Sequence, residues 1–465
     1  MKQNNKLKQY ATELSKTFSL AWPLVIAQLA VIAINTTDVV MMGWLGPEYL
    51  AAGTLSTAIV HPFLLAGLGL LSVVTPLVAQ NLSTKNYTEI RRTTRQGLWL
   101  AALMSLIFVP LLLQIESIIL MLGLDASVAK LAATYMDTAV WYLIPVFLFF
   151  VLRNLVSAHS DTKVILQITL VAIALNALGN YALMFGHFGF ERMELRGAGI
   201  STTFVNTMMF LALLGYVLKH PRYKKYSILV RIYKPDWSIF RKILKLGGPV
   251  GLMIASESGL FSAAAILMGW LGTAELAGHA IALQITAIAF MIPLGLSNAT
   301  TIRVGYAYGL ANSSAVNVAG WVSIGLGIGC MIITLIIFYL FPQWLIHLFL
   351  DPEIAANATA IAYAVSYLLV VTLFQIADGG QVVAAAALRG INDTKVPMYV
   401  AIVGYWIVGM PVAYILGFTF ELRGVGVWLG LAAGLIFVAI VLIYRFWRLA
   451  GNLKFSQQTS NQTPV

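Results

Sequence analysis

The words ELRGAGI, at Glu194–Ile200, and ELRGVGV, at Glu421–Val427, stand 227 residues apart in the chain. One short match could arise by chance, but several words in the same order at a nearly constant offset indicate an internal duplication. The other repeated words are DTKV, beginning at Asp161 and Asp393, and MGWLG, beginning at Met42 and Met268. The chain therefore contains two related halves, and each word marks a corresponding place in both.

Composition indicates that these halves lie in a membrane. The 465 residues are 60% hydrophobic and only 10% charged, and their mean hydropathy is +0.85. A soluble protein carries about 25% charged residues. The single cysteine, Cys330, excludes an intramolecular disulfide and a cysteine-cluster metal site. The first apolar run is too long for a cleavable signal and lacks a small-residue cleavage site, so it is predicted to be retained.

Twelve segments are long and apolar enough to span a bilayer, which requires ~20 residues each. No part of the sequence shows the alternating pattern of barrel strands, so the fold is predicted to be all-α. The predicted spans are Phe18–Met42, Leu50–Gln80, Gly97–Ile115, Ala132–Leu152, Val164–Met184, Ala198–Leu218, Leu246–Leu271, Ala277–Tyr308, Val316–Phe341, Ala358–Leu388, Val396–Phe418 and Val425–Tyr444.

Basic residues are distributed unevenly between the ends of these spans. When the spans alternate in direction, 25 of the 29 Lys and Arg residues fall on one side and 4 on the other. Cytoplasmic loops carry the excess of Lys and Arg, so both termini are predicted to be cytoplasmic. Topology thereby explains the net charge of +11, and no nucleic-acid partner is required. The richest basic stretch, Lys219–Lys245, is predicted to contact anionic lipid headgroups.

Each half contains six predicted spans, an even number, so both halves enter the membrane from the same side. Transporters built from such parallel repeats bind substrate near the midplane between the halves, and the halves rock to alternate access. The repeated DTKV and ELRG words fall at span ends, where turn and cap roles are expected rather than substrate contacts. The predicted organisation is a cytoplasmic N-terminus (1–17), an N-lobe (18–218), a basic cytoplasmic linker (219–245), a C-lobe (246–444) and a cytoplasmic tail (445–465).

Four acidic residues fall within spans: Asp38, Asp137, Glu257 and Asp378. Acids in lipid-spanning helices are costly and usually functional. No Lys or Arg lies in the middle of any span, and Glu257 is ~18 Å along its helix from Lys245. Without an internal counter-ion, such acids must be protonated or bind a cation from outside.

In the second half, Glu257 and Asp378 lie at matched depths near the midplane and are interpreted as one site that could hold sodium. Phe261 is one turn from Glu257 on the same face. Its ring could face a cation or simply pack. A purely structural role is the alternative for both acids.

In the first half, Asp38, Asn176, Asn180 and Thr202 share a depth towards the outer side. Carboxylate, amide and hydroxyl oxygens are the ligands that a small hard cation prefers, so this set is a candidate ion or substrate site. Interhelical hydrogen bonding is the alternative for the two amides. Asp137, near the outer end of its span, is expected to be solvated or to cap.

The segments TTDVVMMGWLG (Thr36–Gly46) and ALRGINDTKVPMYV (Ala387–Val400), with the paired RG-G turns, resemble the multidrug and toxic compound extrusion (MATE) transporters. The resemblance covers almost the whole chain and is greatest to the NorM-type branch. It implies a secondary active efflux transporter that exports cationic, amphipathic drugs by antiport with sodium ions or protons. It also implies a bacterial inner-membrane location, and we expect a monomer without a cofactor.

The resemblance extends to the candidate residues. The family's acid in the first span matches Asp38, its pair in the fifth span matches Asn176 and Asn180, and its hydroxyl in the sixth matches Thr202. Its acids in the second half match Glu257 and Asp378. Proton-coupled members often carry Asp where this chain has Asn180, and the loss of that titratable group favours sodium.

Other classes of function fit the sequence less well. The chain has no H-E-x-x-H, no G-x-S-x-G and no phosphate-binding loop, so we do not expect an enzyme. A flippase for lipids or lipid-linked saccharides is the main alternative, because related folds perform that task. A flippase for anionic headgroups should carry bases in its cavity, whereas the acids here favour cationic substrates. A channel is disfavoured because the duplicated halves indicate rocking domains.

Overall fold

The computed structural model describes residues 2–121, 126–230, 232–350, 352–354 and 357–453. Within these ranges the chain is helical and forms no strand, and twelve helices are long and apolar enough to cross a membrane. The all-α prediction is confirmed. The first six spans are α1 (Lys2–Leu45), α2 (Pro47–Leu71) with α3 (Val74–Ser83), α4 (Tyr87–Leu112), α6 (Ala126–Ala139) with η1 (Val140–Tyr142) and α7 (Leu143–Ala158), α8 (Thr162–Phe185) and α9 (Glu194–Lys219).

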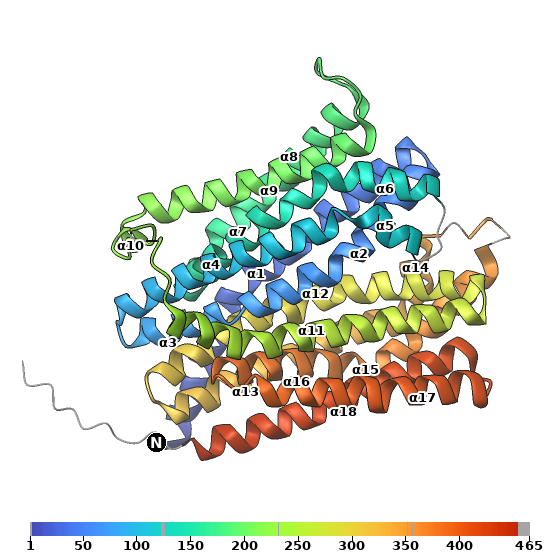
Figure 1. Ribbon diagram of the computed structural model, residues 1–465. Helices are drawn as coiled ribbons and strands as arrows, with labels where there is room; N and C mark the ends of the chain where they lie inside the picture. Colours follow the sequence, from blue (N-terminus) through green and yellow to red (C-terminus); the bar gives the residue numbers. More distant parts are fainter. Residues whose placement is uncertain (1, 122–125, 231, 351, 355–356, 454–465) are drawn as a thin grey trace, which may run out of the picture.

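The second six spans repeat this arrangement below the first six in Figure 1. They are α11 (Trp237–Leu271), α12 (Thr273–Gly309), α13 (Ser313–Leu340), α15 (Ala358–Gly390), an irregular span from α16 to η4, and α18 (Arg423–Asn452). The irregular span consists of α16 (Lys395–Ile402), η3 (Val403–Gly409), α17 (Met410–Tyr414) and η4 (Ile415–Thr419), in which η3 and η4 are π-helical. Short helices α5 (Ile115–Met121), α10 (Pro221–Lys224) and α14 (Pro342–His347) lie between spans.

Several helices extend beyond the apolar spans that the sequence predicts. Helix α1 begins at Lys2, within the expected 1–17 segment, and α18 continues to Asn452, within the expected tail. Helix α11 begins at Trp237, well inside the expected 219–245 linker, because Asp236 Oδ1 accepts a hydrogen bond from the backbone N–H of Ile239 (3.3 Å). An aspartate at this position satisfies an otherwise unpaired helix donor. Hydropathy alone marks only the apolar part of such a helix.

The backbone repeats the duplication at its turns. Six of the nine described non-glycine residues with positive φ, an uncommon conformation, form three matching pairs in the two halves. The pairs are Lys85 (58°) with Ala311 (53°), Ser160 (61°) with Asn392 (64°), and Glu194 (50°) with Glu421 (55°). The same turn geometry is therefore built twice, with different side chains in two of the three pairs.

The repeated DTKV words join neighbouring helices. Asp161 precedes α8 but makes no side-chain cap; its Oδ2 instead accepts hydrogen bonds from Tyr216 Oη (2.6 Å) and Tyr223 Oη (3.1 Å). In the second half, Arg445 Nε donates to Asp393 Oδ2 (2.5 Å). The expected turn role is therefore combined with a bond to the last span of each half, and the expected cap is absent at Asp161.

The ELRG words make the corresponding contacts at the other end of the bundle. Glu194 Oε2 accepts a hydrogen bond from Tyr49 Oη (2.8 Å), which joins the α8–α9 turn to the start of α2. In the second half, Arg423 forms an ion pair with the buried Glu275 at the start of α12. Each of these bonds joins the word to another helix of its own half.

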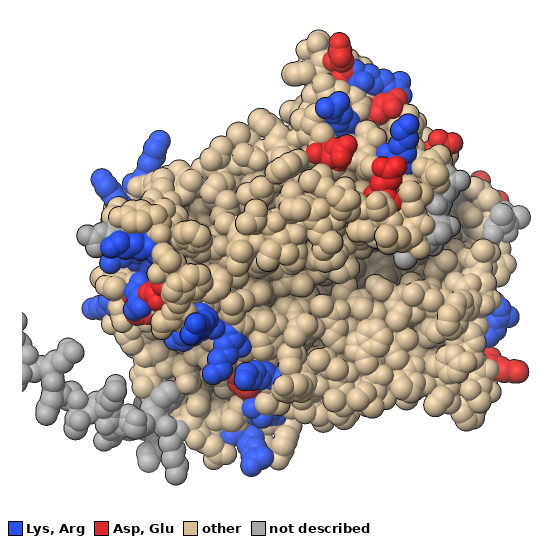
Figure 2. Space-filling view, in the orientation of Figure 1, with Lys and Arg blue, Asp and Glu red and all other residues tan. Residues whose placement is uncertain are grey.

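Two ends of the bundle differ in charge. Figure 2 shows an apolar middle and a group of Lys and Arg side chains at the left end, which we call the basic end. It holds the α3–α4 connection, α10 and the α15–α16 turn. We call the other end, which holds the α8–α9 turn, the opposite end; there Figure 2 shows the surface hollowed between the halves.

The two lobes contact each other along α1 and α12, α2 and α11, and α3 and α12. At the basic end, Gln80 Nε2 donates to the carbonyl of Gly390 (2.8 Å), and Asn392 Nδ2 donates to Gln80 Oε1 (3.0 Å). Arg303 in α12 pairs with Glu13 in α1 (2.5 Å). These bonds hold the lobes together at the basic end.

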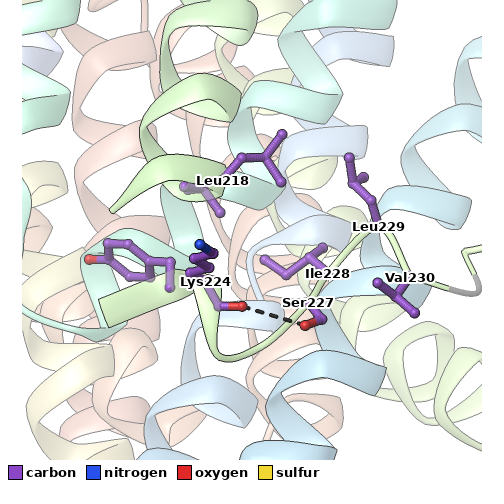
Figure 3. A pocket seen from close by; sticks show the side chains of 8 residues that line it. Leu218, Lys224, Ser227, Ile228, Leu229 and Val230 are labelled. Atoms are coloured by element: carbon purple, nitrogen blue, oxygen red, sulfur yellow. Dashed lines mark hydrogen bonds between the residues drawn. The ribbon is translucent and has the colours of Figure 1, made fainter. Parts of the chain in front are cut away.

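The segment between α9 and α11, residues 220–236, which we call the connection, packs against the basic end. Figure 3 shows Ile228, Leu229 and Val230 beside a small pocket of about 180 Å³ below Leu218. The connection is held to α4 where Arg95 Nε donates to the carbonyl of Ile228 (2.8 Å).

Candidate functional site

In the C-lobe, one amide bridges the two predicted acids. Gln381 Nε2 donates to Glu257 Oε1 (2.9 Å) and lies 3.4 Å from Asp378 Oδ1. Glu257 lies on α11, whereas Asp378 and Gln381 lie one turn apart on α15. Asp378 is 5% exposed and Gln381 is fully buried. The structure therefore brings the two acids to one place, which we call the C-lobe cluster together with Gln381 and Tyr405.

Tyr405 fixes the orientation of the bridging amide. Its hydroxyl donates to Gln381 Oε1 (2.9 Å), so the NH₂ group of Gln381 faces the carboxylates. Tyr405 is fully buried and lies in the π-helical segment η3. Such π segments frequently occur at functional sites because they change the direction of a side chain within a helix.

Sequence reasoning missed Gln381 and Tyr405 because, in the second half, it considered only the acids and one neighbouring aromatic ring. A usable signal existed for the glutamine: Gln375, Asp378 and Gln381 recur every three residues, which places them along one side of α15. Gln375 bonds elsewhere, to Thr334 Oγ1 (3.1 Å). No comparable signal marks Tyr405, whose direction depends on the π turn.

In the N-lobe, the four predicted polar residues meet around one carboxylate. Asn176 Nδ2 (3.0 Å) and Asn180 Nδ2 (2.6 Å) both donate to Asp38 Oδ1. Thr202 Oγ1 lies at 3.5 Å from Asp38 Oδ2. The side chains come from α1, α8 and α9, and all four are buried. We call this set the N-lobe cluster.

The N-lobe cluster contains acceptor oxygens without partners. The Oδ1 atoms of Asn176 and Asn180 are buried and accept no hydrogen bond within the described residues. A buried polar atom without a partner is costly. Two unpaired amide oxygens beside a carboxylate would be satisfied by a hard cation or by a proton-donating group of a substrate.

Neither cluster carries its own positive charge. Within the part of the chain that the structure describes, no ion pair involves Asp38, Glu257 or Asp378. The described residues also contain no group of three or more His, Cys, Asp or Glu side chains arranged for a metal. A cation in either cluster would therefore be held largely by neutral oxygens.

Two predicted candidates lie apart from these contacts. Phe261 is half-buried and packs against the apolar core, so its position accords with the packing alternative. Asp137 is exposed on α6, where its backbone carbonyl accepts from Trp141 Nε1 (3.1 Å).

The two halves also match a known family when the sequence is compared with characterised proteins. The MatE family profile matches residues 23–182 and 249–415, one region in each half. The chain belongs to the MatE family. This confirms the resemblance, and the matched regions hold every member of the two clusters except Thr202.

Full-length relatives agree with this membership in the MatE family. The chain is 42% identical over 438 residues to the "Probable multidrug resistance protein NorM" of Mesorhizobium japonicum, covering 94% of each chain. It is 39% identical over 446 residues to the protein of the same name from Brucella suis biovar 1, covering 96% of this chain and 94% of the other.

Solved MATE structures share the fold. A crystal structure of MATE in complex with MaL6 matches with a TM-score of 0.86 at 21% identity, covering 95% of this chain and 97% of that one. The eukaryotic MATE transporter AtDTX14 matches with a TM-score of 0.83 at 20% identity, covering 96% and 99%. The predicted twelve-helix fold is confirmed, and the chain is a multi-pass membrane protein of a transporter family rather than an enzyme.

Proposed function

We propose that this protein exports cationic, amphipathic drugs from the cell by secondary antiport. The observation that carries the proposal is a pair of largely buried, oxygen-rich clusters, one in each lobe, whose acids form no ion pair within the described residues. Carboxylates within a membrane span that lack a counter-ion are stabilised when they bind a cation from outside. A cationic drug and a coupling ion can bind there in turn. The relatives named multidrug resistance proteins support a drug as the exported substrate.

The arrangement of the lobes supports alternating access. Bonds such as Gln80–Gly390 and Arg303–Glu13 hold the lobes together at the basic end, and Figure 2 shows a hollow between them at the opposite end. The basic end faces the cytoplasm of a bacterial inner membrane by the positive-inside rule. In this proposal the protein works as a monomer, the bonds at the basic end close the cytoplasmic side, and export requires these bonds to break and re-form.

Sodium is the coupling ion in this proposal. Amide, hydroxyl and carboxylate oxygens are suited to a hard monovalent cation. The N-lobe cluster has only one titratable group, Asp38, and two unpaired amide oxygens beside it. The C-lobe cluster offers two carboxylates, Glu257 and Asp378, as a second possible sodium position.

Drug efflux from proteoliposomes tests the proposal, with sodium and pH gradients varied separately at a fixed membrane potential. We expect a sodium gradient to accelerate efflux at constant pH. Asp137→Asn is the control variant. It removes an exposed acid of the N-lobe, which also contains Asp38, and it should leave the efflux rate unchanged. Transport that ignores both gradients would contradict antiport.

Topology is tested by cysteine labelling in a Cys330→Ser background. Lys225, in the connection, and Lys130, on α6, are both exposed and lie at different ends of the bundle. We expect an impermeant reagent added outside the cell membrane to label Lys130→Cys and not Lys225→Cys. The reverse pattern would invert the proposed orientation.

A further inference from the structure

A basic cavity lies at the basic end, where α4 meets the connection and the start of α11. Its volume is about 650 Å³. It is distinct from the two polar clusters, whose residues lie on other parts of the spans. The polar and aromatic side chains that line it are Arg91, Arg92, Arg95, Gln96, Lys234, Asp236 and Trp237.

Positive charge exceeds negative charge in this cavity. Four lining residues are basic, and one, Asp236, is acidic. Asp236 is engaged by Arg92 (Nε to Oδ2, 2.5 Å), whose guanidinium lowers the pKa of Asp236 below its usual value. Arg92 also contacts Glu89. Among the described lining residues, no second acid balances the charge of Arg91 and Lys234.

Two of the residues that line the cavity each have a polar atom without a hydrogen-bond partner within the described residues, one a donor and the other an acceptor. Arg91 Nε, a donor, and Gln96 Oε1, an acceptor, are both buried and make no hydrogen bond within the described residues. The Gln96 residue is only 2% exposed. Leaving such buried groups without a partner is unfavourable. An occupant that accepts from the arginine and donates to the glutamine would remove both costs.

We propose that this cavity binds the phosphate of an anionic phospholipid whose headgroup also carries a hydroxyl, as in phosphatidylglycerol. The phosphate oxygens would accept from Arg91 and attract Lys234, and the hydroxyl would donate to Gln96 Oε1. The source is a membrane lipid because Trp237, 61% exposed beside the cavity, has the position of an interfacial aromatic residue.

The occupant would contact both lobes. Arg91 and Gln96 belong to α4 of the N-lobe, whereas Lys234 and Trp237 belong to the connection and to α11 of the C-lobe. The Arg92–Asp236 pair already joins these elements across the same cavity. This assignment goes beyond drug export and does not depend on the coupling ion.

Native mass spectrometry of the full-length protein with defined lipids tests the proposal. With about 1 kcal/mol contributed by each Lys or Arg, Arg91→Gln with Lys234→Gln should weaken phosphatidylglycerol binding about 30-fold. The matched control is Lys224→Gln with Lys225→Gln, which removes the same charge from the neighbouring connection and should leave binding unchanged. Equal losses in both variants, or equal binding of zwitterionic phosphatidylcholine by the wild type, would overturn the site.

A second variant separates the hydroxyl contact from charge. Phosphatidylmethanol carries the same charge as phosphatidylglycerol but no headgroup hydroxyl. We expect the wild type to prefer phosphatidylglycerol and Gln96→Met to bind both equally, with an unchanged melting temperature as evidence of folding. If glycerol 3-phosphate or inorganic phosphate displaces the lipid at comparable concentrations, the cavity is a soluble-phosphate site and the lipid assignment is wrong.

Discussion

The two lobes share their frame but differ in their polar clusters. The turns repeat, down to paired positive-φ residues, and each half uses its DTKV and ELRG words to join its own helices. The clusters do not repeat. At the offset of 226 residues, the counterpart of Asp38 is Ala264, and the counterpart of Glu257 is Val31. The duplicated architecture therefore carries two chemically different sites at non-equivalent positions.

The difference lies in the number of carboxylates and in what surrounds them. The C-lobe cluster places two acids around one amide, so repulsion between the two negative charges favours occupation by a cation or a proton. The N-lobe cluster surrounds one acid with donors and leaves two amide oxygens unpaired. Mutations that change the number of carboxylates or their polar neighbours in one cluster should therefore separate the contributions of the two lobes to transport.

The largest effect is expected from the paired acids. Glu257→Gln and Asp378→Asn should each reduce efflux by more than about 100-fold, equivalent to ~2.7 kcal/mol, because each substitution removes a carboxylate that the transported cation requires. Drug efflux from proteoliposomes measures the loss, with Asp137→Asn as the control. Near-normal export by both variants would remove the C-lobe cluster from the mechanism, and a failure to fold would assign the acids a structural role.

A smaller loss is expected from Asp38→Asn. The substitution keeps the shape of the side chain but removes the negative charge that accepts bonds from Asn176 and Asn180. Efflux should fall at least about tenfold, equivalent to ~1.4 kcal/mol. Sodium-dependent thermal stabilisation of the protein should persist, because the C-lobe cluster is unchanged. Loss of that stabilisation would show that the two clusters act as a single ion site.

Gln381→Met tests the bridge itself. The change leaves both acids in place but removes the amide between them and the partner of Tyr405. Unpairing buried groups costs about 1–3 kcal/mol, so efflux should fall about tenfold. Gln375→Met, on the same helix but bonded to Thr334, is the control. Equal effects of the two substitutions would indicate a general packing defect in α15.

The sequence alone predicted the twelve spans and most residues of the two clusters, but not the neutral residues that bridge the acids of the C-lobe cluster. Hydropathy located all twelve spans, and the cost of acids in lipid marked Asp38, Glu257 and Asp378. Spacing placed Asn176 and Asn180 on one face. Gln381 and Tyr405 are neutral, so no rule based on charge selects them, and the contact of Gln381 with Glu257 joins residues 124 positions apart. Helix starts such as Trp237 were missed because a cap, rather than apolar length, sets them.

The smallest change in rate, but the most informative change in coupling, is expected from Asn180→Asp. Asn180 is the member of the N-lobe cluster that lies nearest to Asp38, with its amide at 2.6 Å. A carboxylate there would place a second acid beside Asp38. Two carboxylates in contact cannot both be ionised without cost, so the pair would share a proton. The variant should therefore exchange protons where the wild type exchanges sodium.

Efflux from proteoliposomes at fixed membrane potential measures this exchange of ions. Electrical driving force does not distinguish the ions, since each inward charge gains ~2.3 kcal/mol per 100 mV. For the wild type, removal of sodium at constant pH should slow efflux, and removal of the pH gradient should not. For Asn180→Asp we expect the reverse, with a maximal rate within about threefold of wild type, or ~0.6 kcal/mol. If the wild type already ignores sodium and stops without a pH gradient, the sodium proposal is wrong and Asp38 becomes the leading proton carrier.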